Sequence, residues 1–262
     1  MSKACQLFSG SSGNAIWLAC DETKILVDAG VSAKRIEKAL MNIGEDAASL
    51  SAIFVTHEHS DHITGVRVLA SRYGIPVFSG ETILLRMLVD GKLDERVMTS
   101  PVSYGMHIGG VEVLPFELSH DSVQCLGYRF NMPDGRSISV CTDTGYVTAA
   151  AKKTITGSDL VFLESNHEVR MLENGPYTYA LKQRILSRKG HLSNADCAAF
   201  AAELVASGTT RLVLSHISRE NNHPEIARQT TLCALTEAGF TEGEDFRLRV
   251  SPIENTERPI RL

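Results

Sequence analysis

The sequence predicts an α+β protein with two β-sheets packed face to face and helices on the outside. Short apolar runs of strand length recur throughout the 262 residues, and most are bounded by turn-forming residues. The early part of the chain is strand-rich with two helical stretches, whereas the later part alternates strand and helix. We expect this mixture from two sheets that share a core and are covered by helices.

The predicted strands follow from runs rich in Val, Ile, Leu and aromatic residues. In chain order they cover residues 15–20, 24–28, 52–56, 76–79, 111–118, 126–131, 137–142, 159–164 and 211–215. A tight turn is predicted at residues 132–136, because Asp134-Gly135 supplies the positive φ that a hairpin requires.

Three helices are predicted from their caps and spacing. Residues 32–40 begin with Ser32 as a cap and carry apolar residues three to four positions apart. Ser193-Asn194 opens an alanine-rich helix that Gly208 closes. Pro224 begins the third helix, which runs to about Gly239.

The composition is that of a soluble globular protein, with 43% apolar and 22% charged residues. No linker or repeat interrupts it, so we expect one domain over residues 1–262. No run approaches the ~18 apolar residues of a membrane span. The start of the chain lacks a long apolar segment before a small-residue cleavage site, so we expect a cytoplasmic protein without membrane contact.

The six cysteines are scattered and form no Cys-x-x-Cys pair, which predicts buried thiols rather than a zinc knuckle or a disulfide frame. The net charge of −5 argues against a generic basic coat for nucleic acid. It leaves a nucleic-acid enzyme open, since bound divalent metal ions and a few local cations would offset it. The sequence does not indicate the oligomeric state.

The segment His57-Glu58-His59-Ser60-Asp61-His62 carries the strongest chemical signal. Three histidines and an aspartate fall within six residues, and imidazole and carboxylate are ligands for zinc, iron and manganese. In an extended backbone His57 and His59 project to the same side, while the adjacent Asp61 and His62 suit a turn toward a second point. The alternative is a polar surface loop, but this spacing favours two metal ions.

Four predicted strands each end just before a candidate ligand, and these ligands are His57, His120, Asp143 and His216. Rigid strands hold metal ligands at fixed separation better than loops do. Taken alone, His120 or His216 would be an ordinary histidine and Asp143 a turn residue. Their repeated placement after strands favours one shared site.

These residues resemble the metallo-β-lactamase superfamily, whose two-metal hydrolases share this ligand order. The resemblance implies an αββα sandwich of two mixed sheets with the metals at one edge. It implies that His57, His59 and His120 hold one metal ion, that Asp61, His62 and His216 hold the other, and that Asp143 bridges them. Asp28 matches an early aspartate that supports the ligand loop from behind.

Further motifs resemble ribonuclease Z-type nucleases. Glu164 and His191 match a pair that would protonate a departing sugar oxygen, although His191 alone reads as a loop histidine. A basic stretch and a Gly/Ser turn are candidate phosphate contacts. The basic residues are Arg170, Lys182, Arg184, Arg188 and Lys189, and the substrate-binding candidates are Ser11, Ser12, Asn14, His167 and Asn222.

The set of motifs is similar to the YycJ/WalJ group of bacterial exonucleases. This resemblance implies 5′-to-3′ digestion of DNA with a metal-bridging hydroxide, a link to DNA repair, and a preference for DNA over RNA. The implied cofactors are two divalent metal ions, zinc or manganese, with iron a third candidate. Asp61 would orient the attacking water. The alternatives are a thioesterase or lactonase of the same fold, a ribonuclease, and a metal-bound module without enzymatic activity.

Overall fold

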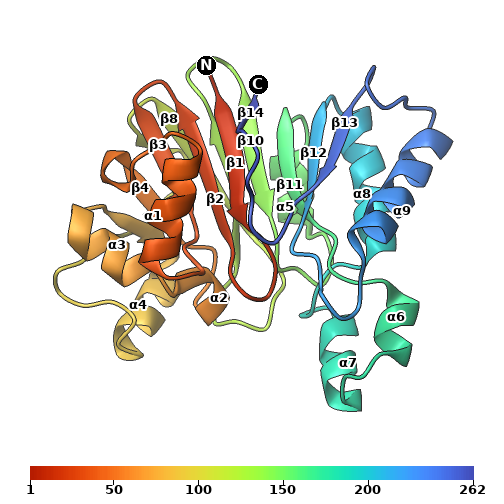
Figure 1. The fold of residues 1–262 in the computed structure, drawn as a ribbon, viewed down its shortest axis with the longest axis horizontal. Helices are drawn as coiled ribbons and strands as arrows, with labels where there is room; N and C mark the ends of the chain where they lie inside the picture. Colours follow the sequence, from red (N-terminus) through yellow and green to blue (C-terminus); the bar gives the residue numbers. More distant parts are fainter.

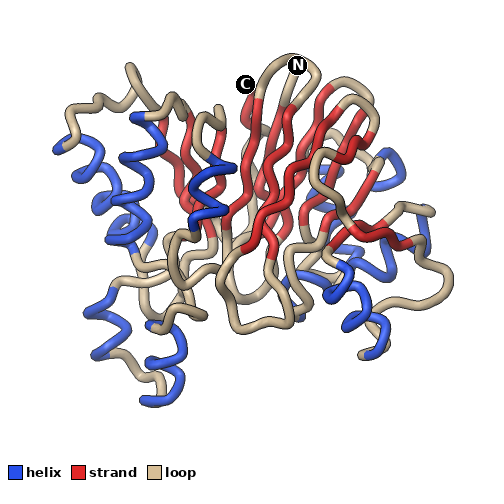
Figure 2. Tube along the Cα trace, turned by 180° about the vertical axis from the view of Figure 1, so that it is seen from behind, coloured by secondary structure: helices blue, strands red, loops and turns tan.

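The computed structural model describes residues 1–262 and contains two seven-stranded β-sheets. The sheets lie face to face, with helices α1, α3 and α4 beside one and α8 and α9 beside the other (Figure 1). The view from behind shows the same order, with strands at the centre and helices on both sides (Figure 2). The predicted fold class is therefore confirmed.

The first sheet has the strand order β14-β1-β2-β3-β4-β5-β6. Strands β14 to β3 are antiparallel and β3 to β6 are parallel, so the sheet is mixed. The strands are β1 (Lys3–Phe8), β2 (Ala15–Cys20), β3 (Thr23–Val27), β4 (Ala52–Phe54), β5 (Val77–Ser79), β6 (Thr99–Pro101) and β14 (Ile260–Arg261). The helices between them are α1 (Ala33–Asn42), η1 (Ala47–Ser49), α2 (Ser60–Ile63), α3 (Val66–Tyr73) and α4 (Glu81–Val89).

The second sheet has the order β13-β12-β11-β10-β9-β8-β7 and is also mixed, parallel from β10 to β13 and antiparallel from β7 to β10. The strands are β7 (Met106–Ile108), β8 (Val111–Glu117), β9 (Leu126–Asn131), β10 (Ser137–Cys141), β11 (Leu160–Glu164), β12 (Arg211–Ser215) and β13 (Arg247–Val250). The helices are α5 (Ala149–Ile155), α6 (Val169–Asn174), α7 (Tyr179–Leu186), α8 (Asn194–Ala206) and α9 (Pro224–Glu237).

Two apolar cores hold the layers together. Between the sheets, the ring of Phe54 lies 5.3 Å from that of Tyr128 and 5.5 Å from that of Phe130, both in edge-to-face contact. The second core lies between the second sheet and α8 and α9. Successive side chains of β12 point to opposite faces of the sheet, so this strand contributes to both cores. Val213 faces the first sheet, while Leu212 and Leu214 belong to the second core.

The structure confirms all nine predicted strands, several of them one or two residues shorter, and the three predicted helices. The hairpin also forms, with Gly135 at φ 81° and the Met132 amide donating to the Arg136 carbonyl over 2.7 Å. The early part holds four α-helices rather than two helical stretches. The prediction of buried thiols is wrong for Cys233, which is exposed on α9, while the other five are buried and all six are free.

The parallel strands β3 and β4 of one sheet and β10, β11 and β12 of the other are followed by loops at one end of the molecule. In Figure 1 this is the lower end, where α2, α6 and α7 also lie. The two chain termini lie at the upper end, where β14 pairs with β1. No helix of the structure has both the length and the apolar character needed to cross a membrane.

Candidate metal centre

Three of the residues that follow parallel strands adopt a left-handed backbone conformation. Asp28 after β3 has φ 61°, Asp143 after β10 has φ 66°, and His216 after β12 has φ 56°. Non-glycine residues rarely adopt this conformation, which costs roughly 1–2 kcal/mol each. The strain is local to the points where these strands end, directly before the loops that carry the donor residues.

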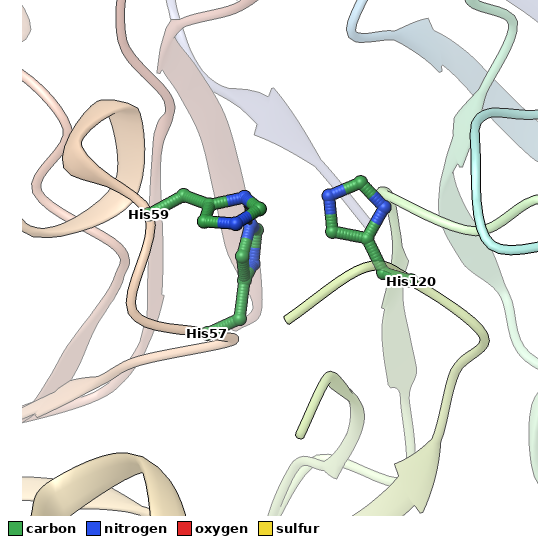
Figure 3. Close-up of side chains that lie close together, drawn as sticks. All are labelled: His57, His59 and His120. Atoms are coloured by element: carbon green, nitrogen blue, oxygen red, sulfur yellow. Dashed lines mark hydrogen bonds between the residues drawn. The ribbon is translucent and has the colours of Figure 1, made fainter. Parts of the chain in front are cut away.

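His57, His59 and His120 form the first donor group, and their ligand atoms lie within 4.8 Å of one another. The Nε2 atom of His57 lies 3.1 Å from the Nδ1 atom of His59. His120 approaches from the opposite side, on the loop after β8, so that the three rings face a common space (Figure 3). The ring centroid of His120 is 5.0 Å from that of His57 and 5.1 Å from that of His59.

Asp61, His62 and His216 form a second donor group within the same 4.8 Å limit. The Asp61 carboxylate lies 3.5 Å from His62 Nε2 and 4.0 Å from His216 Nε2. Asp143 lies between the two groups, since it also groups with His57 and His62, and its Oδ2 atom is 3.5 Å from His62 Nε2. The structure thus brings together all seven ligand candidates that the sequence indicated.

Four of these imidazole rings, all except His59, have one nitrogen in contact with a neighbouring polar group. His62 Nδ1 lies 2.7 Å from Asp28, and His57 Nδ1 lies 3.0 Å from the Thr56 hydroxyl. The contacts of the other two rings are His120 Nδ1 to the Gly190 carbonyl, 3.1 Å, and His216 Nδ1 to Asp143 and Glu164, each 3.0 Å. The second nitrogen of each ring belongs to the candidate donor groups, an arrangement that resembles metal-binding histidines.

Two buried polar atoms at the centre of this cluster have no hydrogen-bond partner, namely Asp143 Oδ2 and His216 Nε2. Their residues are 1% and 2% exposed. Burying an unpaired polar atom is unfavourable unless a ligand satisfies it. A cation would satisfy both atoms, so the donor set fits divalent metal ions such as zinc, manganese or iron.

Buried carboxylates surround the histidines of these groups, and they shift the pKa values of both residue types. Burial disfavours the charged form of His216, but Asp143 and Glu164 outweigh it and raise the pKa of His216 to about 10. Burial also opposes ionisation of Asp143, yet His216 and His62 hold the pKa of that carboxyl well below its usual range. The carboxylates therefore attract positive charge into the site, and a metal ion would meet the same attraction.

Asp28 and Thr56 support the ligand loop. The Asp28 carboxylate accepts hydrogen bonds from the Thr56 amide over 2.8 Å and from its hydroxyl over 2.9 Å, in addition to its contact with His62. Behind this contact, the Asn14 amide donates to the Asp61 carbonyl over 2.8 Å. A Cβ atom on Gly30 would lie 1.6 Å from that carbonyl oxygen, so only glycine allows this approach.

Glu164 and His191 lie beside the two donor groups, and with Asp143 and His216 they form a further set whose ligand atoms lie within 4.8 Å of one another. Glu164 is completely buried, and its Oε1 atom lies 2.7 Å from His191 Nδ1. Its Oε2 atom accepts hydrogen bonds from the Thr144 and Leu192 amides. Burial raises the pKa of the Glu164 carboxyl, but His191 and His216 outweigh this and lower the value to about 2. An ionised Glu164 therefore fixes the orientation of the His191 ring.

The substrate-binding candidates differ in their surroundings. Ser11 and Ser12 are exposed, and the Ser12 hydroxyl accepts a hydrogen bond from Arg219 over 2.8 Å. Asn14 is buried, with Nδ2 3.0 Å from His62 Nε2. Asn222 is also buried, and its Nδ2 donates to the Ser165 and Asn166 carbonyls and to the Asn194 side chain, so it braces loops rather than facing the site.

His167 is 2% exposed, and its Nδ1 atom has no hydrogen-bond partner. Burial lowers the pKa of His167 to about 4, so the ring is neutral at physiological pH. Among the basic residues, Arg184 pairs with Asp121 and Lys182 donates to the Glu173 carbonyl, while Arg188 stacks 3.9 Å from the Tyr146 ring centre. Arg170, Arg188 and Lys189 are exposed.

Sequence reasoning did not single out Thr56, Gly190 or Arg219 as site residues. Thr56 precedes His57 directly, and its place inside the motif was the only available signal. Gly190 and Arg219 act through contacts with His120 and Ser12, which are distant in the chain and have no local sequence signal.

Comparison with known proteins agrees with this geometry. The family model described as Beta-lactamase superfamily domain matches residues 23–217. Exodeoxyribonuclease YycJ of Bacillus anthracis is 38% identical over 245 residues, which cover 92% of each chain. Exodeoxyribonuclease WalJ of Streptococcus pneumoniae is 39% identical over 246 residues, which cover 92% of this chain and 91% of the relative.

The metallo-β-lactamase fold protein YhfI from Bacillus subtilis superposes with a TM-score of 0.70, at 15% identity, over 97% of this chain and 98% of its own. At that identity the likeness concerns the fold alone. The chain belongs to the β-lactamase superfamily and has its metallo-β-lactamase fold. Together with the histidine and aspartate cluster, this makes it a metal-dependent hydrolase.

Proposed function

We propose that this protein is a two-metal nuclease that cleaves phosphodiester bonds, and specifically a 5′-to-3′ exonuclease acting on DNA. The observation that carries the proposal is the buried Glu164 hydrogen-bonded to His191 beside the metal donors. A phosphodiester has a poor leaving group that gains from a proton donor, whereas the thiolate of a thioester leaves without one. The names of the two curated relatives support DNA as the substrate.

The residues that would hold the metal ions are those of the two donor groups. His57, His59 and His120 would hold one ion, Asp61, His62 and His216 would hold the other, and Asp143 would be shared. When bound, divalent ions of this kind lower the pKa of water and neutralise charge on a phosphoryl group. Zinc and manganese both suit this mixture of nitrogen and oxygen donors.

Asp61 is the residue that we propose to orient the attacking water. Its side chain is 23% exposed, which makes it more accessible than Asp143 at 2%. It therefore reaches the solvent side of the cluster, where its carboxylate accepts a hydrogen bond from water and can take its proton. Burial raises the pKa of Asp61, but His62 outweighs this, so the carboxyl stays ionised.

His191 is the residue that we propose to donate a proton to the departing sugar oxygen. Its side chain is 19% exposed, so one edge of the ring is open to a substrate while Nδ1 is held by Glu164. The ring centroid of His191 lies 5.0 Å from that of His120 and 5.1 Å from that of His216, which places it between the two donor groups. This is where a leaving group would depart.

Basic side chains around the same edge would contact the DNA backbone. Arg188 is exposed and held by its stacking on Tyr146, and Arg219 is exposed and bonded to Ser12. Positive residues that neutralise phosphates supply affinity without reading sequence. Local basic contacts of this kind are compatible with the net charge of −5. The digestion polarity and a role in DNA repair rest on the resemblance to the YycJ/WalJ group.

The test is a product ladder from duplex and single-stranded DNA, and from RNA, labelled at either end and incubated with Mn²⁺, Zn²⁺ or a chelator. We expect mononucleotides released from the 5′ end of DNA, with no products in chelator. Asp61→Ala, Asp143→Ala and His62→Ala should each abolish the activity, which excludes a contaminating nuclease. Hydrolysis of acyl thioesters without any nuclease activity would establish the alternative hydrolase instead.

A further inference from the structure

A cavity lies at the open edge between the two sheets, with β12 and β13 on one side and β14 on the other. It has a volume of about 220 Å³ and eight lining residues. Four of these are arginines, and none is acidic. The lining residues are Arg211, Leu212, Val213, Arg247, Arg249, Pro259, Ile260 and Arg261.

Strand register explains how the arginines come together. Arg211 and Val213 lie on the same face of β12, and Val213 faces the first sheet. Arg247 is paired with Arg211, and Arg249 with Val213, so both point to this face. Arg261 lies on β14 of the first sheet, opposite Lys3. Residues of both sheets therefore line one space.

Neighbouring carboxylates neutralise only part of this charge. Arg249 contacts Glu257 at 3.5 Å, but the Glu257 side chain is 71% exposed. Asp159, whose negative charge acts on Arg211, is already bonded to Arg136 at 2.7 Å and to Ser137. Burial lowers the pKa of Arg211, and the charges of Arg247 and Arg136 lower it further. Like charges paired across strands are unfavourable without a counter-ion.

The cavity is distinct from the metal centre. Arg211 is the first residue of β12, whereas His216 follows its last residue. His216 is five positions after Arg211, which corresponds to about 16 Å along a strand. The arginine side chains thus lie toward the opposite end of the sandwich from the proposed nuclease site.

We propose that the cavity lined by Arg211, Arg247, Arg249 and Arg261 binds a small phosphate-bearing molecule, separately from the metal centre. Arginine matches a phosphate through paired hydrogen bonds from its planar guanidinium group. A volume of about 220 Å³ corresponds to roughly seven water molecules, enough for a phosphate or diphosphate group. A duplex nucleic acid would instead need a long open groove.

The test is isothermal titration of the full-length, metal-loaded protein with inorganic phosphate and with ADP, and in a separate arm with a phosphorothioate duplex that resists cleavage. The variants are Arg247→Gln on the second sheet and Arg261→Gln on the first. The matched control is Lys92→Gln, an exposed cation outside the cavity. Thermal melts of each variant check that it folds, which is expected because Arg247 and Arg261 are exposed.

We expect both arginine variants to lose at least about tenfold in affinity for phosphate or ADP, with no change in the control. Any phosphate that binds at the metal centre adds the same titration signal in the wild type, the variants and the control. Nuclease activity should be equal in Arg247→Gln and wild type, so this result stands apart from the proposed function. Equal phosphate affinity in all proteins would overturn the proposal, and so would a loss confined to duplex binding.

Discussion

The Nδ1 atom of His120 lies 3.1 Å from the carbonyl oxygen of Gly190, a residue 70 positions further along the chain. Two further contacts join the same two segments: the Ser119 hydroxyl donates to the Arg188 carbonyl over 2.8 Å, and Arg184 pairs with Asp121. His191 follows Gly190 directly. One turn thus positions both a proposed metal ligand and the proposed proton donor.

Gly190→Ala should therefore damage the site from outside it. A Cβ atom at this position would lie 2.0 Å from the Ile185 carbonyl oxygen, so the turn must move and carry the Gly190 carbonyl with it. A displacement of about 1 Å in a catalytic group costs on the order of 100-fold in rate, which we expect in kcat for DNA cleavage. Gly110→Ala is the control, because its nearest neighbours would be at 3.4 Å. Equal rates in the two variants would show that the turn does not position the site.

His191→Ala should slow DNA cleavage by about 10²- to 10⁴-fold while leaving the metal content largely unchanged. The reason is that neither proposed ligand group includes His191, which contacts Glu164 and forms a further set with Asp143 and His216. A nitrophenyl phosphodiester, whose leaving group needs no proton, should lose far less activity than DNA does. If the variant instead lost its metal ions, His191 would be a ligand and its proposed role would be wrong.

Asp28→Asn should weaken metal binding about 10- to 100-fold without unfolding the protein. Asparagine tolerates the left-handed backbone at this position, but its amide cannot accept a hydrogen bond as both carboxylate oxygens do. Asp21→Asn is a matched control, since Asp21 also has a positive φ, of 50°, and its side chain is 69% exposed. Metal titration of the two variants gives the comparison, and identical affinities would remove Asp28 from its supporting role.

The double variant Arg188→Ala with Lys189→Ala should raise KM for DNA and make binding less sensitive to salt. Each lost phosphate contact should reduce the slope of log K against log salt by about 0.9 for duplex DNA. The control is Lys34→Ala with Lys38→Ala, which removes the same charge from the exposed side of α1. A similar change of slope in both double variants would mean that only net charge matters.

Most of the fold was predictable because its signals are local. The strands that precede His57, Asp143 and His216 are short, rich in apolar residues and almost completely buried, as expected of strands covered on both faces. His57, His120, Asp143 and His216 were predictable because each follows a predicted strand. The remaining donors, His59, Asp61 and His62, were predictable because they lie within a few residues of His57. The left-handed φ values at Asp143 and His216 could not be predicted, because neither residue type requires that conformation.

The elements that escaped prediction depend on distant partners. Strand β14 has only two residues, and it exists because Ile260 pairs with Ala4 at the other end of the chain. Helix α7 has no buried residue, so it shows no apolar face to recognise. The bracing role of Asn222 depends on carbonyls more than fifty residues away, which no local pattern encodes.

The donors come from both sheets: His57, His59 and His62 follow β4 of the first, and His120 and His216 follow strands of the second. A cation bound by these donors would link the two sheets, and its binding free energy would add to the free energy of unfolding. At a free metal concentration 100 times the dissociation constant, this amounts to about 2.7 kcal/mol. Removal of the metal ions would then weaken the packing of the two sheets as well as abolish the catalytic activity.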